Sequence, residues 1–431
     1  MSYSACYDET LGFTTRQLHA GYDPAEHNRA KTAPVYQTAV FELGSYERGL
    51  RLFEYAEEGH SYVRFSNPTN TVLEKRISSL EGGSAAVSFA SGMAGISSTI
   101  LNLAKAGDEI VSIKTLYGGS TTLFEKLLPD YGIHTRFVEH ENDPEEYRAL
   151  INEKTKAVYV ESLGNPGINI VDLEAVAAVA HEYGVPVVVD NTFATPYLFR
   201  PFEHGADIVC YSATKFLAGH GTTIAGLVVE KGDFNWRSGR FPQFDKYYAD
   251  NVEFMGEEVL SRELFTKRLR QTYLTDLGAH MSPTSAFLLM QGIETLSLRM
   301  RQHVKNAQDV AEFLEAHPAV KQVNYPGLKN SPYYDLSQKY FPEGPGAILS
   351  IRVNGGLEGA KKVVNNVKLF DYMVNVGDAK SLIVHSASTT HYGQSKEMQE
   401  AAGVYEDTLR LSIGIEDTED LINDLRQALE S

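Results

Sequence analysis

The chain has 431 residues, more than one hydrophobic core usually serves, so we expect two domains. Its composition, 43% hydrophobic and 22% charged, is that of a globular protein, and its net charge of −17 argues against nucleic acid and anionic membranes as partners. Two cysteines, Cys6 and Cys210, are too few for a disulfide framework or a cysteine-rich metal site, so we expect a cytoplasmic protein without a bound metal.

The first 66 residues lack steady periodicity and contain many turn formers, for example Gly21-Tyr22-Asp23-Pro24. We expect an extended N-terminal arm over residues 1–66 that packs on a neighbouring subunit. The N-terminus does not resemble a signal peptide, and no apolar run is long enough to span a bilayer. Arg64, near the end of this arm, is either a solvated charge or a phosphate ligand, and the pattern leaves both open.

A regular alternation of strands and helices follows the arm. A helix is predicted from Asn67-Pro68 to Leu80, before Gly82-Gly83. Further helices are predicted over 92–105, from about 120 to 128, and over 144–152 and 172–183. The predicted strands cover residues 85–89, 109–113, 135–138, 157–161, 187–190, 208–211 and 225–230. This alternation predicts a doubly wound, largely parallel α/β sheet over residues 67–280.

Two turns in this region carry candidate ligand groups. Ser91-Gly92-Met93 joins a strand to a helix, and backbone N–H groups at a helix N-terminus bind phosphate. It is not a GxGxxG or GxxxxGK[ST] motif, which disfavours nicotinamide and nucleoside triphosphate ligands. The alternative is that these glycines only permit close packing. Tyr117 follows the next strand, where its ring either stacks on a cofactor or makes ordinary contacts.

Lys215 is the candidate nucleophile. It follows a short buried strand and is flanked by Ser212 and Thr214, which suits a Schiff base to an aldehyde cofactor with a phosphate group. Asp190 ends the preceding valine-rich strand and would lie at the same edge of a parallel sheet. A carboxylate there can keep a pyridine nitrogen protonated, whereas its commoner use is to cap a helix or form a turn.

The remainder of the chain changes character. Residues 232–260 are aromatic and aperiodic and predict a long loop at a substrate entrance or subunit contact. A helical pattern runs from 262 to about 314 with a break at 281–283, and residues 281–431 predict a C-terminal α+β domain. Its predicted strands cover 347–353, 382–385 and 408–413, and its helices 356–367 and 417–429. Arg410, in an apolar strand, is either a surface charge or an inward-facing carboxylate clamp.

Six of these segments together resemble the pyridoxal-phosphate enzymes of cysteine and methionine metabolism, the trans-sulfuration family, over nearly the whole chain. They are Tyr62 to Thr69, Ser91-Gly92-Met93, Tyr117-Gly118-Gly119, Asp190 to Phe193, Ser212 to Lys215, and Leu409 to Ser412. The resemblance implies the aspartate-aminotransferase-like fold, with the large domain binding pyridoxal 5'-phosphate. It also implies a homotetramer built from dimers that share active sites.

The same resemblance implies the role of each residue. Lys215 would hold the cofactor covalently, Asp190 would pair with its ring nitrogen, and Tyr117 would stack on the ring. The other cofactor ligands would be Gly92, Met93, Thr192, Ser212 and Thr214, with Tyr62 and Arg64 from the neighbouring subunit. Arg410, assisted by Ser381 and Asn165, would hold the α-carboxylate of an amino-acid substrate.

Within the family, the sequence is most similar to the branch that sulfhydrylates O-acetylhomoserine. The motifs Glu161 to Pro166, Phe193 to Tyr197, Pro283 to Phe287 and Ser388 to His391 carry this likeness. It implies formation of homocysteine from O-acetylhomoserine and sulfide, or a small thiol. Alternatives are γ-elimination, as in methionine γ-lyases, use of O-succinylhomoserine or O-acetylserine, and a silent oligomeric scaffold. Gly119 disfavours the lyase, since that branch typically has cysteine there, and Tyr211 stands where many relatives have histidine.

Overall fold

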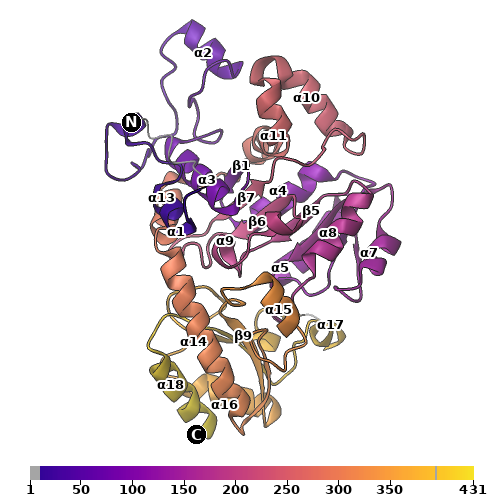
Figure 1. Cartoon of the computed structure of the whole chain (residues 1–431), viewed down its shortest axis with the longest axis vertical. Coiled ribbons are helices and arrows are strands. Elements are labelled where there is room, and N and C mark those ends of the chain that lie inside the picture. The colour runs from indigo at the N-terminus through magenta and orange to yellow at the C-terminus, as the bar shows by residue number, and fades with distance from the viewer. Residues whose placement is uncertain (1–9, 394–395) are drawn as a thin grey trace.

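Two β-sheets organise the chain (Figure 1), and the structure, a computed structural model, describes residues 10–393 and 396–431. The larger sheet has seven strands in the order β1-β7-β6-β5-β4-β2-β3. These are β1 (Ala85–Phe89), β2 (Glu109–Ser112), β3 (His134–Phe137), β4 (Thr155–Glu161), β5 (Val187–Asp190), β6 (Ile208–Ser212) and β7 (Gly226–Glu230). The structure confirms the predicted strands and their largely parallel arrangement; β7 is antiparallel to both of its neighbours.

Helices cover both faces of this sheet (Figure 1). The helices of this part of the chain are α3 (Pro68–Glu81), α4 (Gly92–Leu103), α5 (Gly118–Thr122), α6 (Leu128–Asp130), α7 (Pro144–Leu150), α8 (Leu173–Glu182), α9 (Thr195–Leu198), α10 (Pro242–Met255), α11 (Glu257–Arg268), α12 (Thr275–Leu277) and α13 (Pro283–Ile293). π-Helical stretches at Leu123–Leu127 and Leu269–Leu274 join α5 to α6 and α11 to α12. Because helices cover both faces, the central strands carry unbroken buried valine runs, as at Val187–Val189.

Local sequence explains where α3 begins and ends. The Asn67 side chain accepts a hydrogen bond from the Thr69 N–H, and Pro68 occupies the first helical position, where no backbone donor is needed. Gly82 ends the helix with φ of 81°, a left-handed conformation that costs glycine little. The predicted helix of this region is therefore confirmed to within a residue.

The smaller sheet has five strands in the order β10-β11-β12-β9-β8. They are β8 (Val320–Asn324), β9 (Ile348–Val353), β10 (Asp371–Tyr372), β11 (Leu382–His385) and β12 (Thr408–Ser412), with helices α14 (Leu296–Ala316), α15 (Tyr334–Tyr340), α16 (Gly356–Asn366), α17 (Lys396–Ala401) and α18 (Thr418–Glu430). Sequence reasoning found β9, β11 and β12 but missed β8 and β10. β8 is a half-exposed edge strand with Lys321 and Gln322 in its middle, so its apolar signal is weak.

One prediction was wrong. Residues 232–260 were expected to form a long loop, but they contain α10 and the start of α11. Phe244 of α10 is fully buried beside Trp236 and Phe241, so an aromatic cluster supplies the packing that stabilises this helix. Aromatic residues have modest helix propensity, and tertiary contacts outweigh that preference here.

The N-terminal arm contains two short helices, α1 (Phe13–His19) and α2 (Tyr46–Phe53). α2 lies at the end of the molecule opposite the C-terminus in Figure 1. Several large apolar side chains of the arm are exposed in the single chain, among them Tyr46 (81% exposed), Phe53 (60%) and Val40 (57%). Residues 1–9 of the predicted arm, including Cys6, lie outside the described residues.

The predicted domain boundary at residue 281 stays a prediction. α13, which follows it, packs on α3 beside the large sheet, and the Asn70 side chain donates a hydrogen bond to the Met281 carbonyl at 3.0 Å. The first strand of the smaller sheet begins only at Val320.

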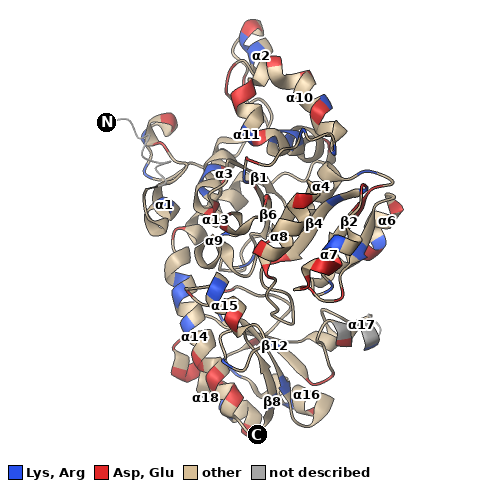
Figure 2. Ribbon diagram, turned by 45° about the vertical axis from the view of Figure 1, so that its right-hand side comes forward, with Lys and Arg blue, Asp and Glu red and all other residues tan. Residues whose placement is uncertain are grey.

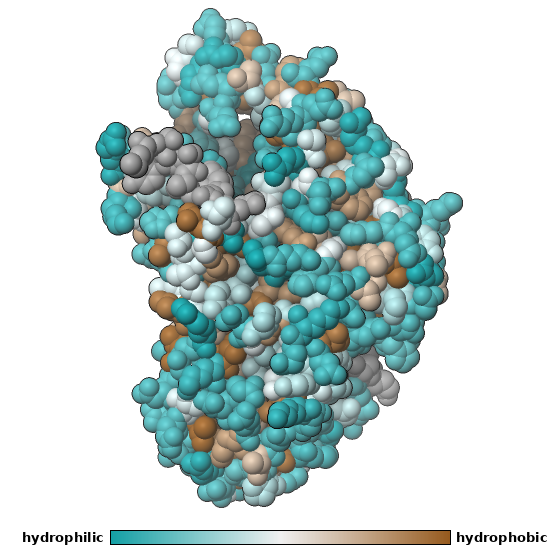
Figure 3. Space-filling model, viewed as in Figure 1, coloured by the Kyte–Doolittle hydropathy of each residue, from teal (hydrophilic) through white to brown (hydrophobic). Residues whose placement is uncertain are grey.

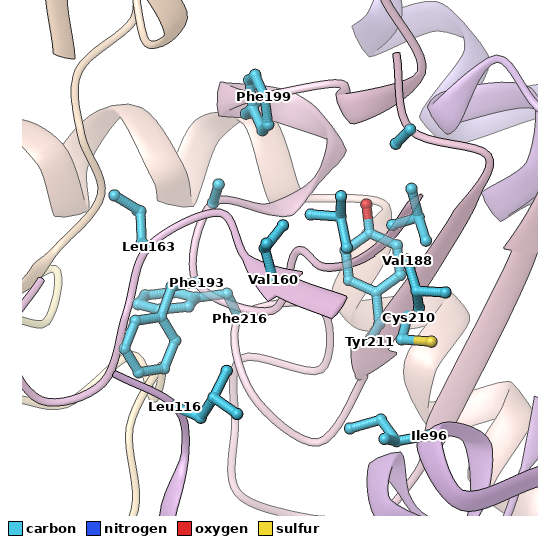
Figure 4. Packing of buried hydrophobic residues seen from close by; sticks show 14 of the residues in the cluster. Ile96, Leu116, Val160, Leu163, Val188, Phe193, Phe199, Cys210, Tyr211 and Phe216 are labelled. Atoms are coloured by element: carbon cyan, nitrogen blue, oxygen red, sulfur yellow. The ribbon is translucent and has the colours of Figure 1, made fainter. Parts of the chain in front are cut away.

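Polar and charged residues dominate the surface, whereas the interior is apolar. Figure 3 shows a mostly hydrophilic face with scattered apolar residues, and the colouring of the ribbon in Figure 2 shows acidic and basic residue positions interspersed along the outer helices. Figure 4 shows Tyr211 and Cys210 of β6 beside Val188 of β5, with Phe193 and Phe216 nearby in the core. In the described part of the chain, no helix is both long and apolar enough to cross a membrane.

The long helix α14 connects the two sheets through buried polar side chains. Arg299 donates to the carbonyls of Phe216 (2.8 Å), Gly292 (2.8 Å) and Leu217 (3.4 Å). About two helical turns further along α14, the Asn306 side chain donates to the Gly414 carbonyl, just after β12. α14 therefore fixes the segment after Lys215 relative to the smaller domain.

We predict that Arg299→Met lowers the free energy of unfolding by about 3 kcal/mol, because buried carbonyls lose their donor. Differential scanning calorimetry measures the change as a lower melting temperature. Arg301→Met, at an exposed position of the same helix, is the matched control and should change stability by less than about 0.5 kcal/mol. Equal melting temperatures for the two variants would contradict the stabilising role of the bonds from Arg299.

Candidate active site

The carboxyl ends of three parallel strands meet at one edge of the large sheet. Glu161, the last residue of β4, pairs in register with Asp190, the last residue of β5. Asp190 in turn pairs with Cys210 of β6, two residues before that strand ends at Ser212. Ligands of open α/β sheets bind at this edge, and Lys215 follows three residues after Ser212.

Asp190 is a buried carboxyl whose partners are hydroxyl and backbone groups. Its Oδ1 accepts from the Thr192 N–H (3.0 Å) and the Thr192 hydroxyl (2.5 Å), and Tyr159 donates to Oδ2 at 3.4 Å. Burial raises its pKa, and the bonds from Thr192 oppose this shift. Among the described residues no Lys, Arg or His forms an ion pair with it, so a cationic ring nitrogen would find an unpaired carboxylate here.

Lys215 is half-buried and contacts a residue from the other domain. Its Nζ donates to Asn375 Oδ1 at 2.6 Å. Burial, and then the nearby charge of Arg410, lower the pKa of the lysine to about 8. A substantial fraction of the amine is therefore neutral near physiological pH, as a nucleophilic lysine requires.

The N-terminus of α4 forms a cradle against the end of β6. Ser91 caps this helix by accepting from the Ala94 N–H, and the N–H groups of Gly92 and Met93 precede the first intrahelical bonds. A Cβ at Gly92 would lie 2.8 Å from Cα of Ser212, so only glycine allows this approach. A helix N-terminus beside a serine hydroxyl is suited to a phosphate group.

Two further predicted phosphate-side residues stabilise this cradle. The Ser212 N–H donates to the Thr192 hydroxyl at 2.8 Å, which connects the cradle to Asp190. The Thr214 hydroxyl accepts from the Ala225 N–H at 2.9 Å and donates to the Ala225 carbonyl at 3.3 Å. The role of Thr214 as a phosphate ligand stays a prediction.

Tyr117 directly precedes α5, and its side chain is 47% exposed. Its N–H donates to Glu161 Oε1 at 2.6 Å, which fixes the backbone beneath the ring. A Cβ at position 119 would lie 2.5 Å from the Tyr117 ring, so Gly119 makes room for the ring in this orientation.

Arg410 resolves the choice that its sequence pattern left open, because its side chain faces inward and is only 5% exposed. It donates to Asn165 Oδ1 at 3.1 Å and to the Asn375 carbonyl at 3.4 Å. No ion pair to it occurs among the described residues, and burial lowers its pKa to about 10. A buried guanidinium without a carboxylate partner is a ready binding site for one.

The structure does not join the other predicted residues to this site within one chain. The Ser381 hydroxyl donates to Glu416 Oε2 at 2.9 Å and accepts from the Gly414 N–H, so its donor is already used. Arg64 donates to the Thr275 carbonyl and lies over the ring of Tyr62, in the N-terminal arm. The roles given to these three residues stay predictions.

Two residues of the site were missed by sequence reasoning. Asn375, the partner of Lys215 and Arg410, lies in an aperiodic segment between β10 and β11 and has no local signal. Glu161 had a signal that was not used, since it ends a buried strand beside Asp190, where charge is costly. Among the described residues, no cluster of His, Cys, Asp and Glu could hold a metal ion.

Comparisons with known proteins agree with this geometry. A homocysteine synthase of Schizosaccharomyces pombe is 46% identical over 98% of this chain and 99% of its own. An O-acetyl-L-homoserine sulfhydrylase of Thermus thermophilus is 44% identical over 97% and 100%. An L-methionine gamma-lyase of Treponema denticola is 41% identical over 98% of both chains.

A solved structure gives the same relationship in three dimensions. A protein of Campylobacter jejuni assigned as an O-acetylhomoserine (thiol)-lyase superposes with a TM-score of 0.93 and 37% identity, over 98% of this chain and 100% of that one. That structure contains N'-pyridoxyl-lysine-5'-monophosphate.

The residues of this site fit pyridoxal phosphate. They offer a lysine with a lowered pKa, an unpaired buried carboxyl for the ring nitrogen, and a helix N-terminus for the phosphate. The family model for Cys/Met metabolism PLP-dependent enzymes matches residues 14–430. The chain is therefore a pyridoxal-phosphate-dependent enzyme and belongs to the Cys/Met metabolism family.

Proposed function

We propose that this enzyme makes homocysteine and acetate from O-acetylhomoserine and sulfide, a γ-replacement that serves methionine biosynthesis. The observation that carries the proposal is the buried, unpaired guanidinium of Arg410 close to Lys215, which suits the α-carboxylate of an amino-acid substrate. The relatives named homocysteine synthase and O-acetyl-L-homoserine sulfhydrylase, which match almost end to end, support the choice of this reaction.

Pyridoxal phosphate, when bound, supplies an electron sink for negative charge that develops on the substrate. Lys215 would hold the group covalently, and its amine, once free, would take the α-proton at Nζ. Asn375 Oδ1 orients that Nζ, and Arg410, itself held by Asn165, orients the carboxylate. Positioning the proton and its acceptor in this way removes much of the entropic barrier.

Asp190 and Tyr117 act on the ring. The carboxylate of Asp190, oriented by two bonds from Thr192, would keep the ring nitrogen protonated. The Tyr117 ring would cover one face of the cofactor and exclude water from it. Loss of a second proton, from the β-carbon, would let acetate leave from the γ-carbon. Sulfide would then add at that γ-carbon, and protons would return to the β- and α-carbons to give homocysteine.

The proposal includes a shared active site. The exposed apolar side chains of the arm, including Tyr46 and Phe53, make a second copy of this chain the expected partner, and burying them would stabilise the contact. Tyr62 and Arg64 would then reach the phosphate of the neighbouring subunit, in a dimer that pairs into a tetramer. We place this assembly in the cytoplasm, in line with the buried free thiol of Cys210.

γ-Elimination is the second candidate, because the gamma-lyase of Treponema denticola is also 41% identical. The close packing of Gly119 on the Tyr117 ring disfavours it. A cysteine, the residue typical of methionine γ-lyases at this position, would fit only if the ring moved.

We expect the enzyme to form homocysteine from O-acetylhomoserine only when sulfide is present. The test measures homocysteine and 2-oxobutyrate in parallel reactions with and without sulfide. 2-Oxobutyrate and ammonia as main products in both reactions would instead establish elimination.

Lys215→Ala should abolish turnover without unfolding the protein, since the amine is the proton acceptor; a near-normal rate would contradict its role.

We expect the rate of cofactor attachment to apo-enzyme to rise with pH and level off above about pH 8, because only neutral Lys215 attacks an aldehyde. Arg410→Met removes a repulsive charge, raises the pKa of the lysine and shifts this profile to higher pH. Arg352→Met, at a β9 residue whose side chain pairs with Asp407 just before β12, is the control and should not shift this pH profile. Visible absorbance of the attached cofactor measures the rate, and identical profiles for both variants would contradict the coupling.

We also expect Arg410→Met to raise KM for the amino acid at least about 100-fold, the equivalent of a lost charged hydrogen bond of roughly 3 kcal/mol. Steady-state kinetics with the cofactor-saturated variant measures the change. An unaltered KM would show that the carboxylate binds elsewhere.

A further inference from the structure

Two carboxyl groups lie side by side at the site edge of the sheet, and the reaction described above uses only one of them. Glu161 and Asp190 are register partners on adjacent strands, and both are buried, with 4% and 7% of their surfaces exposed. The carboxyl of Glu161 has no ion-pair partner among the described residues. A carboxyl group is costly to bury, so the presence of Glu161 at this buried position calls for an explanation.

The contacts of the Glu161 side chain explain why a carboxyl group is buried here. One carboxyl oxygen accepts from the Tyr117 N–H at 2.6 Å, and the backbone N–H of Asn165 is close enough to this carboxyl to lower its pKa. Tyr117 is the proposed ring-stacking residue, and Asn165 holds Arg410 at 3.1 Å. One side chain therefore joins the segment that covers the cofactor ring to the segment that holds the substrate clamp.

A second contact shows that these two segments form one unit. The Asn169 side chain donates to the Thr115 hydroxyl at 2.7 Å, two residues before Tyr117. Glu161 lies at the base of this unit, at the end of a rigid strand, and so sets where both segments begin.

We propose that Glu161 is a positioning residue that fixes Tyr117 and Asn165 as an uncharged carboxyl, and so leaves the negative charge of the pair on Asp190. This inference rests on the roles proposed above for Tyr117, Asn165 and Asp190. In this proposal Glu161 is protonated and Asp190 is ionised, because the two carboxyls have different surroundings.

The surroundings of the pair favour this distribution of charge. Asp190 accepts two bonds from Thr192 and one from Tyr159, whereas Glu161 accepts from backbone N–H groups alone. Burial, and then the charge of Asp190, raise the pKa of Glu161 well above its usual range. Tyr159 and Cys210, the other titratable groups beside the pair, stay neutral because burial raises their pKa as well.

Glu161→Ala and Glu161→Gln in the full-length enzyme separate the parts of the proposal. Glutamine keeps the shape and the acceptor oxygen but cannot ionise, whereas alanine leaves the Tyr117 N–H without a partner. Glu230→Ala is the matched control. Glu230 is a buried carboxyl that accepts from the Thr266 N–H at 2.8 Å, but it lies at the opposite edge of the sheet, since it pairs with Ile208 at the start of β6.

The measurements are the affinity for pyridoxal phosphate and the visible circular dichroism of the bound cofactor, which reports how its ring sits. We expect Glu161→Ala to weaken cofactor affinity about tenfold and to change the dichroic band, and Glu161→Gln to restore both to within about threefold of the native protein. Glu230→Ala should lower the melting temperature but keep the native band.

Two results would overturn the proposal: a native band and affinity in Glu161→Ala, or a Glu161→Gln protein without the native band and affinity. If the alanine variant does not fold, the dichroic band and the cofactor affinity of the glutamine variant alone decide the proposal. Because neither measurement includes an amino-acid substrate or sulfide, the outcome is independent of whether the enzyme performs γ-replacement.

Discussion

The active site depends on charges that are buried without an opposite charge beside them. Asp190 at the sheet edge and Arg410 on the smaller sheet each lack an ion-pair partner among the described residues. Burying such groups costs several kcal/mol each, which the hydrophobic core around the two sheets must offset. In the proposed function, the cationic ring nitrogen of the cofactor would pair with Asp190, and the carboxylate of the substrate would pair with Arg410.

Contacts between the two domains give this arrangement its precision. Lys215 belongs to the large domain, but its amine is held by Asn375 of the smaller one. α14 supports the junction, because Arg299 binds the carbonyls that follow Lys215. Lys215, the proposed nucleophile, and Arg410, the proposed carboxylate clamp, are thus fixed relative to each other by backbone and side-chain bonds, an arrangement that favours fast chemistry.

The two neighbouring carboxyl groups, Asp190 and Glu161, differ in the hydrogen-bond donors that surround them. Thr192 gives Asp190 two donors that favour its charged form, while Glu161, one strand away, receives only backbone donors. Two carboxyls so close cannot both ionise cheaply. Their different partners therefore decide where the charge of the site lies.

The sequence by itself determined the periodic parts of the fold and the residues with a distinctive chemistry. Buried valine runs ending in Asp190, the glycine turn at Gly92 and the lysine after β6 each carry a local signal, because strand burial, helix capping and turn geometry depend on neighbouring residues. The tertiary structure alone decided the rest. Asn375 has no local pattern, and α10 is stabilised by the packing of Phe244 on Phe265 of α11 as well as on Trp236, so neither could be recognised before the chain was folded. The inward direction of Arg410 was also open, since an apolar strand has two faces and only packing between the domains selects one.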